Sequence, residues 1–163
     1  MKTLLILRHA KSSWKNAALA DHDRPLNGRG KRDAQRMGEL LADEDLTPDL
    51  IVSSTAKRAR KTAAKVAEIC RCERAIELRD DLYHAHPQTC ISVLSEVYYD
   101  DPCVMIVGHN PGLEELLEIT SGVCARLRTA TLAQVMLPIE SWQDLTVETE
   151  GALANLWQPR ELD

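Results

Sequence analysis

The chain has 163 residues, enough for one domain with a substantial core, and its shares of apolar (44%) and charged (28%) residues are typical of a folded globular protein. The formal charge of −5 argues against a nucleic-acid partner, because phosphate backbones are bound mainly by clustered Lys and Arg. No apolar run approaches membrane-spanning length, no cleavable signal is visible, and the five cysteines lack CxxC or zinc-finger spacing. We therefore expect residues 1–163 to form one cytoplasmic domain with reduced thiols and no membrane contact.

The first predicted strand is the aliphatic run of residues 4–7, which leads directly into Arg8 and His9. Such a run is typical of a strand that is buried on both faces of a sheet. Open α/β sheets bind ligands at the carboxyl ends of their strands. There, a guanidinium suits phosphate or carboxylate, and an imidazole suits a nucleophile, a base or a metal ligand.

A polar stretch without periodicity follows at residues 11–26 and is predicted to be a long loop, a class of segment that is often functional. Asn27 offers an N-cap for a helix over residues 28–43, where apolar residues repeat at helical spacing. Residues 50–54 are predicted to form a second short buried strand.

The next helix is predicted from the apolar stripe Ala59, Ala63, Val66 and Cys70, with Ser54 or Thr55 available as its cap. Arg58 then lies in the first turn, where a cation opposes the helix dipole. An anion bound at the same helix end would explain this placement, and simple exposure of Arg58 is the alternative. The basic run at residues 57–61 is interpreted as a solvated helix face rather than a nucleic-acid patch.

The second half continues the alternation of strands and helices. We expect a strand at residues 75–78, a loop at 79–87, a helix at 88–99, a strand at 103–107 and a helix with Leu113, Leu116 and Leu117 on its inner face; residues 130–137 and 152–157 are β-like, with a short segment around Trp142 between them. His109 again falls between the end of a hydrophobic strand and a helix.

This pattern predicts an α/β fold in which right-handed crossovers build a mostly parallel sheet covered by helices on both faces, a three-layer α/β/α sandwich. Strand ends of a parallel sheet share one edge, so Arg8, His9, Arg58 and His109 are expected to meet there. Two arginines and two histidines around one point suit a phosphoryl group, with His9 placed to attack phosphorus.

At this point the chain resembles the histidine phosphatase superfamily, which has a phosphoglycerate mutase-like fold. Arg8-His9-Ala10 matches its Arg-His-Gly signature with alanine in place of glycine, and Ser53-Ser54-x-x-x-Arg58-x-x-x-Thr62 and Gly108-His109 follow in the expected order. The opening at residues 8–14, the Arg24-Pro25-Leu26-Asn27-x-x-Gly30 motif and residues 108–112 are most similar to the small bacterial phosphohistidine phosphatase (SixA-like) group.

The resemblance implies that His9 is the nucleophile and that Arg8, Arg58 and His109 bind the phosphoryl oxygens. It also implies that no metal or organic cofactor is needed. Ser12 and Asn16 are candidates for further contacts to substrate, or they satisfy the loop backbone. His84 and His86 are interpreted as exposed loop histidines rather than a zinc site.

The general acid is the point of departure from the family pattern. Many members use a carboxylate after the third strand, and only Asp80 and Asp81 occupy that region here, where turn aspartates are the alternative. A missing acid would favour a phosphoramidate or an activated ester, because a phosphohistidine nitrogen departs with less help than an alkoxide. The connections are also too short for a sizeable lid. An open pocket of this kind would admit a phosphohistidine on another protein.

The leading hypothesis is therefore a phosphatase that acts through His9 on a phosphorylated protein. A phosphomonoesterase for small substrates is the second hypothesis, and a phosphate-binding module without turnover is the third. An intact His9 argues against the third, because a pure binder has no use for a nucleophile.

Overall fold

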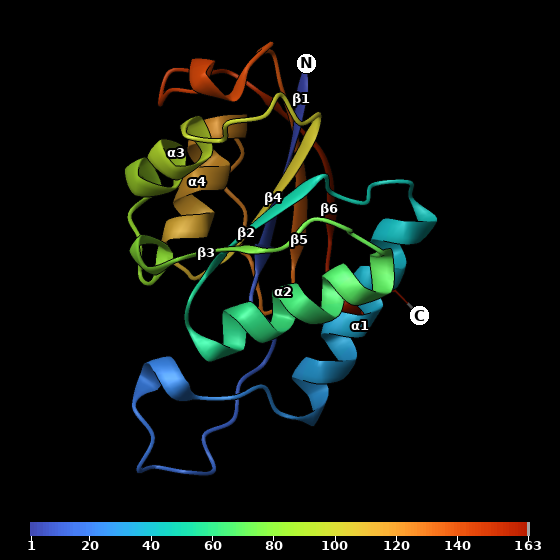
Figure 1. The fold of residues 1–163 in the computed structure, drawn as a ribbon, viewed down its shortest axis with the longest axis vertical. Helices are drawn as coiled ribbons and strands as arrows, with labels where there is room; N and C mark the ends of the chain where they lie inside the picture. Colours follow the sequence, from blue (N-terminus) through green and yellow to red (C-terminus); the bar gives the residue numbers. More distant parts are fainter. Residues whose placement is uncertain (163) are drawn as a thin grey trace.

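The computed structural model describes residues 1–162 and shows a six-stranded sheet with helices packed against it (Figure 1). The final residue of the predicted domain, Asp163, lies outside the described residues. In chain order the strands and helices are β1 (Lys2–Arg8), α1 (Gly28–Asp43), β2 (Leu50–Ser54), α2 (Lys57–Cys70), β3 (Glu77–Arg79), α3 (Pro87–Ser95), β4 (Cys103–Gly108), α4 (Gly112–Ser121), β5 (Leu132–Leu137) and β6 (Ala152–Trp157).

The strand order is β3-β2-β4-β1-β5-β6. Strands β3, β2, β4 and β1 pair in parallel, whereas β5 and β6 are added in antiparallel orientation at one side. Helices α1 and α2 cover one face of the sheet, and α3 and α4 cover the other (Figure 1). The predicted α/β fold with a mostly parallel sheet between two helical layers is confirmed.

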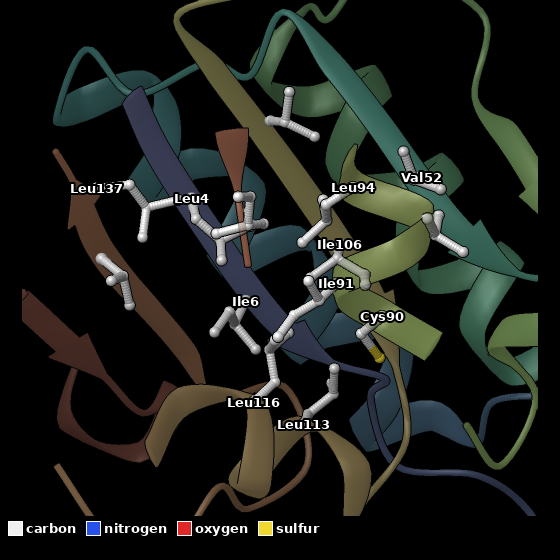
Figure 2. Close-up of a cluster of buried hydrophobic side chains, with 14 of the residues drawn as sticks. Leu4, Ile6, Val52, Cys90, Ile91, Leu94, Ile106, Leu113, Leu116 and Leu137 are labelled. Carbon is white, nitrogen blue, oxygen red and sulfur yellow. The ribbon is translucent and has the colours of Figure 1, made fainter. Parts of the chain in front are cut away.

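The strand β1 forms the centre of the core because its side chains alternate between two buried faces. Leu4 and Ile6 pack in the cluster on the α3/α4 side, where Figure 2 shows them near Leu94 of α3 and Leu116 of α4. Leu5 and Leu7 pack in the second cluster, on the α1/α2 side. A continuous aliphatic run is what a strand buried on both faces requires.

Two predicted elements differ in extent from those observed. The helix expected over residues 88–99 ends at Ser95, because the N–H groups of Glu96 and Val97 bond three residues back to the carbonyls of Val93 and Leu94 and so tighten the last turn. The segment after it is held by side chains distant in the sequence, which donate to the backbone carbonyls of Val97, Asp100 and Asp101. The strand expected at residues 75–78 is the short edge strand β3, in which Leu78 is half exposed.

The carboxyl ends of β1, β2 and β4 lie at the same edge of the sheet. The register pairs Arg8 with Gly108 and Ser53 with Val107, so the segments that follow these three strands start side by side. The first turn of α1 lies against the loop after β1, since a Cβ at Gly30 would lie 2.1 Å from the Lys11 carbonyl oxygen. Within residues 1–162, no helix combines the length and apolar character needed to cross a bilayer.

Candidate active site

A polar cavity of about 270 Å³ opens at this edge of the sheet. It is lined by Arg8, His9, Lys11, Ser12, Trp14, Asp21, Arg24, Arg58, His84, His109, Asn110 and Thr129. The four residues predicted to converge, Arg8, His9, Arg58 and His109, are all among them. They come from three separate strand ends, as expected for the carboxyl edge of a parallel sheet.

His9 is held so that its ring nitrogen Nε2 is unprotonated and can act as a nucleophile. Its side chain is buried, and Nδ1 lies 2.8 Å from the carbonyl oxygen of Ala10. A carbonyl only accepts hydrogen bonds, so Nδ1 carries the proton and Nε2 keeps its lone pair. Burial, opposed by the hydrogen bond to Ala10 and aided by nearby arginines, lowers the pKa of His9 from 6.5 to about 4. The imidazole is therefore neutral at pH 7, as a nucleophile requires.

His109 is buried and hydrogen-bonded to Ser54. Its Nε2 lies 2.8 Å from Oγ of Ser54, and that oxygen also accepts a hydrogen bond from the N–H of Ala56. Nδ1 of His109 is a buried atom without a hydrogen-bond partner among the described residues. Burial first, and then the charge of His9, lower the pKa of His109 to about 3. The two imidazole centroids are 5.2 Å apart.

Arg58 is buried and ion-paired rather than exposed. It is 4% exposed, and its guanidinium donates to the carbonyl oxygen of Asp21 at 2.8 Å and to the Asp21 carboxylate at 2.9 Å. The Asp21 carboxylate also accepts a hydrogen bond from the Tyr83 hydroxyl at 2.5 Å. This hydrogen bond and those from Arg58 lower the pKa of Asp21 to about 2, so Asp21 is ionised at pH 7.

Arg24 adds a third guanidinium to the cavity. It is 7% exposed, donates to Oγ of Ser12 and lies 3.2 Å from the Asp21 carboxylate. Its guanidinium stacks on the ring of Trp14, 3.3 Å from the centroid. Nε of Arg24 and Nε of Arg8 are both buried without a partner among the described residues. Buried donors of this kind are costly unless a ligand satisfies them.

Thr62 connects the nucleophile loop to the helix that carries Arg58. Its hydroxyl accepts a hydrogen bond from the N–H of Ala10 at 3.0 Å and donates to the carbonyl oxygen of Arg58 at 2.7 Å. The spacing Arg58-x-x-x-Thr62 places both residues on the same side of α2, one turn apart. One side chain therefore fixes the position of Arg58 relative to His9.

The remaining predicted site residues are placed differently. Ser12 lines the cavity, whereas the Asn16 side chain accepts a hydrogen bond from the Ala18 N–H within its own turn. Neither Asp80 nor Asp81 lines the cavity: Asp80 accepts a hydrogen bond from Thr55, and Asp81 is ion-paired with a neighbouring arginine. Substrate contacts by Asn16 and proton donation by Asp80 or Asp81 remain predictions.

Several lining residues were not identified as site residues from the sequence. Asp21 and Trp14 lie in a loop without periodicity, which offers no signal for the direction of their side chains. Arg24 had a signal, because it belongs to the motif that carried the family resemblance. His84 lines the cavity with a positive φ of 52°, and its Nε2 lies 3.5 Å from the Asp21 carboxylate. No group of three or more potential metal-binding side chains lies together within residues 1–162.

Acidification should destabilise the folded chain through His9 and His109. Their pKa values of about 4 and about 3 in the folded chain lie below the ordinary value of 6.5. At a pH between the folded and the ordinary value, the unfolded chain therefore binds more protons than the folded chain. This stability is complete above pH 6.5 and falls as the pH drops toward 4, by on the order of 2 kcal/mol for each histidine at pH 5. Urea unfolding at pH 7 and pH 5 measures the loss.

The double variant His9→Gln/His109→Gln is the control, because glutamine does not titrate. Its stability should change much less between the two pH values. The pKa of Asp21 is about 2, so protonation of that carboxylate acts at lower pH. An equal loss in the double variant would assign the pH dependence to other groups.

The sequence matches a known family model and is similar to curated proteins of a plant and of bacteria. Residues 4–91 match the model of the histidine phosphatase superfamily, branch 1. An uncharacterized chloroplastic protein of Arabidopsis thaliana is 34% identical over 154 residues, which cover 88% of this chain and 70% of the relative. An uncharacterized protein of Mycobacterium tuberculosis is 33% identical over 117 residues, 72% and 71% of the two chains.

Solved structures share the same fold over nearly the full length. A candidate phosphohistidine phosphatase SixA from Nakamurella multipartitia superposes with a TM-score of 0.85 at 26% identity and covers 97% of this chain and 96% of its own. A candidate SixA from Agrobacterium tumefaciens gives 0.79 at 30% identity, with 97% and 98% coverage. The protein histidine phosphatase SixA in complex with tungstate gives 0.84 at 21% identity, covers 99% of both chains and supports the fold.

Proposed function

Because the chain belongs to branch 1 of the histidine phosphatase superfamily and is a phosphatase, we propose that it hydrolyses phosphohistidine on a protein through a phosphorylated His9 intermediate. The observation that carries this proposal is the chemistry of the cavity. A neutral imidazole with a free Nε2 lies among guanidinium groups and a second buried imidazole, and Asp21, the carboxylate in the cavity lining, is ionised and has no proton to supply. The substrates named for the solved relatives support the same choice.

The first step transfers the phosphoryl group to the enzyme. Nε2 of His9 attacks phosphorus, a P–N bond forms, and the bond to the leaving atom breaks with its electron pair on that atom. Arg8, Arg58 and His109 stabilise the charge on the transferred oxygens. In the second step a water oxygen attacks phosphorus, the P–N bond to His9 breaks, and inorganic phosphate leaves.

The leaving group must depart with little help from a protein acid. Asp21 is the carboxylate that lines the cavity, and with a pKa of about 2 it holds no proton at pH 7. An alkoxide needs a proton as it leaves, whereas the ring nitrogen of phosphohistidine leaves more readily. The proposal of a phosphohistidine substrate follows from this difference.

Hydrolysis of small phosphomonoesters is the second candidate, and the position of His84 favours it. Its imidazole lines the cavity beside the Asp21 carboxylate, and imidazole is a common general acid. The ring centroids of His84 and His109 are 5.4 Å apart. If esters are the true substrates, His84 rather than Asp80 or Asp81 is the residue placed to assist.

We expect kcat/KM for a phosphohistidine peptide to exceed that for small alkyl phosphomonoesters by about 10² or more, since only the ester needs strong proton donation. The Asp80→Asn and Asp81→Asn variants should retain activity on both substrates within a few-fold, and His84→Ala should lower only the ester reaction. Steady-state kinetics on the two substrate types distinguishes the two candidate functions. Faster ester turnover that depends on Asp80, Asp81 or His84 would establish the second candidate instead.

A further inference from the structure

A second hollow, separate from the catalytic cavity, is lined mainly by lysines. It has a volume of about 450 Å³, and its lining consists of Pro25, Leu26, Lys31, Lys57, Lys61 and Lys65. We call it the lysine cleft. Four of the seven lysines in the whole sequence line it, although the chain carries a formal charge of −5. Positive charge is therefore concentrated in one place on a chain that is negative as a whole.

The lysines are not arranged to stabilise the fold. Lys57, Lys61 and Lys65 repeat every four residues along α2, and like charges at this spacing repel each other. Lys31 of α1 lines the same hollow and adds a further positive charge. Within residues 1–162, the recorded ion pair of this set joins Lys65 to Glu68 at 3.5 Å. A negatively charged ligand would remove the repulsion among the others.

The lysine cleft borders the catalytic cavity. Lys57 directly precedes Arg58, and Pro25 directly follows Arg24, so adjacent residues of two segments line the two hollows. Leu26 also forms a β-bridge with Ser12 of the cavity. In Figure 1 the loop before α1 passes beside α2, which brings these two segments together at the sheet edge. A ligand at His9 that extends past this wall would reach the cleft.

We propose that the lysine cleft binds an acidic segment of the phosphorylated protein whose phosphoryl group enters the cavity. This inference rests on the proposed function. The two hollows are lined by different residues, so one small phosphoester does not fill both, whereas a protein surface contacts both at once. Lysine ammonium groups are flexible point charges without the planar fork of arginine, which suits several carboxylates rather than one fixed phosphate.

The cleft should therefore control the capture of protein substrates rather than the chemical step. Complementary charges accelerate association and lose their effect as ionic strength rises. At low salt we expect kcat/KM for an acidic peptide to exceed that for a neutral peptide by about tenfold, because a few exposed ion pairs together contribute this much. Hydrolysis of a small aryl phosphate, which occupies the cavity alone, should not depend on the cleft.

The test compares phosphohistidine peptides that differ in their flanking residues. One set carries four Asp or Glu residues before or after the phosphohistidine, and the other set carries Ser at these positions. They are assayed with the wild-type chain, with Lys31→Gln/Lys61→Gln/Lys65→Gln and with the control Arg32→Gln/Arg71→Gln/Arg160→Gln, which removes the same charge from exposed positions elsewhere. An aryl phosphate reports basal activity in each variant.

The wild type and the arginine control should prefer the acidic peptides, and the lysine variant should lose the preference while its aryl phosphate activity stays unchanged. Equal kcat/KM for both peptide sets in the wild type, or a preference that survives the lysine substitutions, would overturn the proposal. So would equally effective competition by a single-stranded oligonucleotide, because the cleft would then bind any polyanion.

Fluorescence anisotropy of a labelled unphosphorylated acidic peptide separates this proposal from the proposed function. If aryl phosphate is hydrolysed but no phosphohistidine peptide is, the proposed substrate is wrong. Even then, weaker binding of the acidic peptide by the lysine variant than by the wild type and the arginine control would support the proposal that the lysine cleft binds acidic segments. The absence of such a difference would contradict the cleft, whatever the substrate.

Discussion

His9→Ala should reduce turnover of any phosphorylated substrate by roughly 10⁴-fold or more, because it removes the atom that forms the P–N bond. Nδ1 of His9 is tied to the Ala10 carbonyl, and the neutral ring presents Nε2 to the cavity. The arginines and His109 would still bind phosphate in the variant. The expected signature is therefore loss of kcat with retained binding of inorganic phosphate, measured by kinetics and calorimetry.

His86→Ala is the matched control, since that imidazole is not among the residues that line the cavity. It should retain wild-type activity. Brief exposure of the wild type to radiolabelled substrate should also give an acid-labile, alkali-stable label that is missing in His9→Ala. Full activity in His9→Ala would refute the mechanism, and tight phosphate binding with neither turnover nor label would identify a binding module instead.

Arg58→Ala should lower kcat/KM by about 10²–10³-fold, the usual cost of removing one preorganised charge from a transferring group. Its guanidinium is 4% exposed and aligned by two hydrogen bonds to Asp21, so little reorganisation is needed when a phosphoryl group binds. Arg58→Lys should recover only part of the loss, because lysine lacks the bidentate fork. Steady-state kinetics on one aryl phosphate measures both variants.

Arg60→Ala, on the same helix but outside the cavity lining, is the control for effects on α2 as a whole. It should stay within a few-fold of wild type. Arg58→Ala also leaves Asp21 with one fewer partner, so urea unfolding must accompany the kinetics. Activity of Arg58→Ala close to wild type, with unchanged stability, would show that Arg58 holds the loop at Asp21 and does not contact substrate.

Local patterns were sufficient to predict most of the fold. The aliphatic runs of β1 and β4 and the apolar stripes of α1 and α2 are set by neighbours in the chain, and they appear where expected. The end of α3 was predicted too late because the segment after Ser95 is held by side-chain donors distant in the sequence, which bond to its backbone carbonyls. Long-range hydrogen bonds of this kind leave no periodic signal.

The candidate site likewise combines features that local sequence patterns predict with features that depend on long-range contacts. The sequence by itself determined that Arg8, His9, Arg58 and His109 lie at or just after the carboxyl ends of strands of one parallel sheet, because hydrophobic runs fix the strands and parallel strands end at one edge. Only the tertiary structure decided which carboxylate lies beside them. It places Asp21, from a loop without periodicity, against Arg58 and leaves Asp80 and Asp81 outside the cavity. The path of such a loop depends on contacts with residues far away in the chain, which no local pattern encodes.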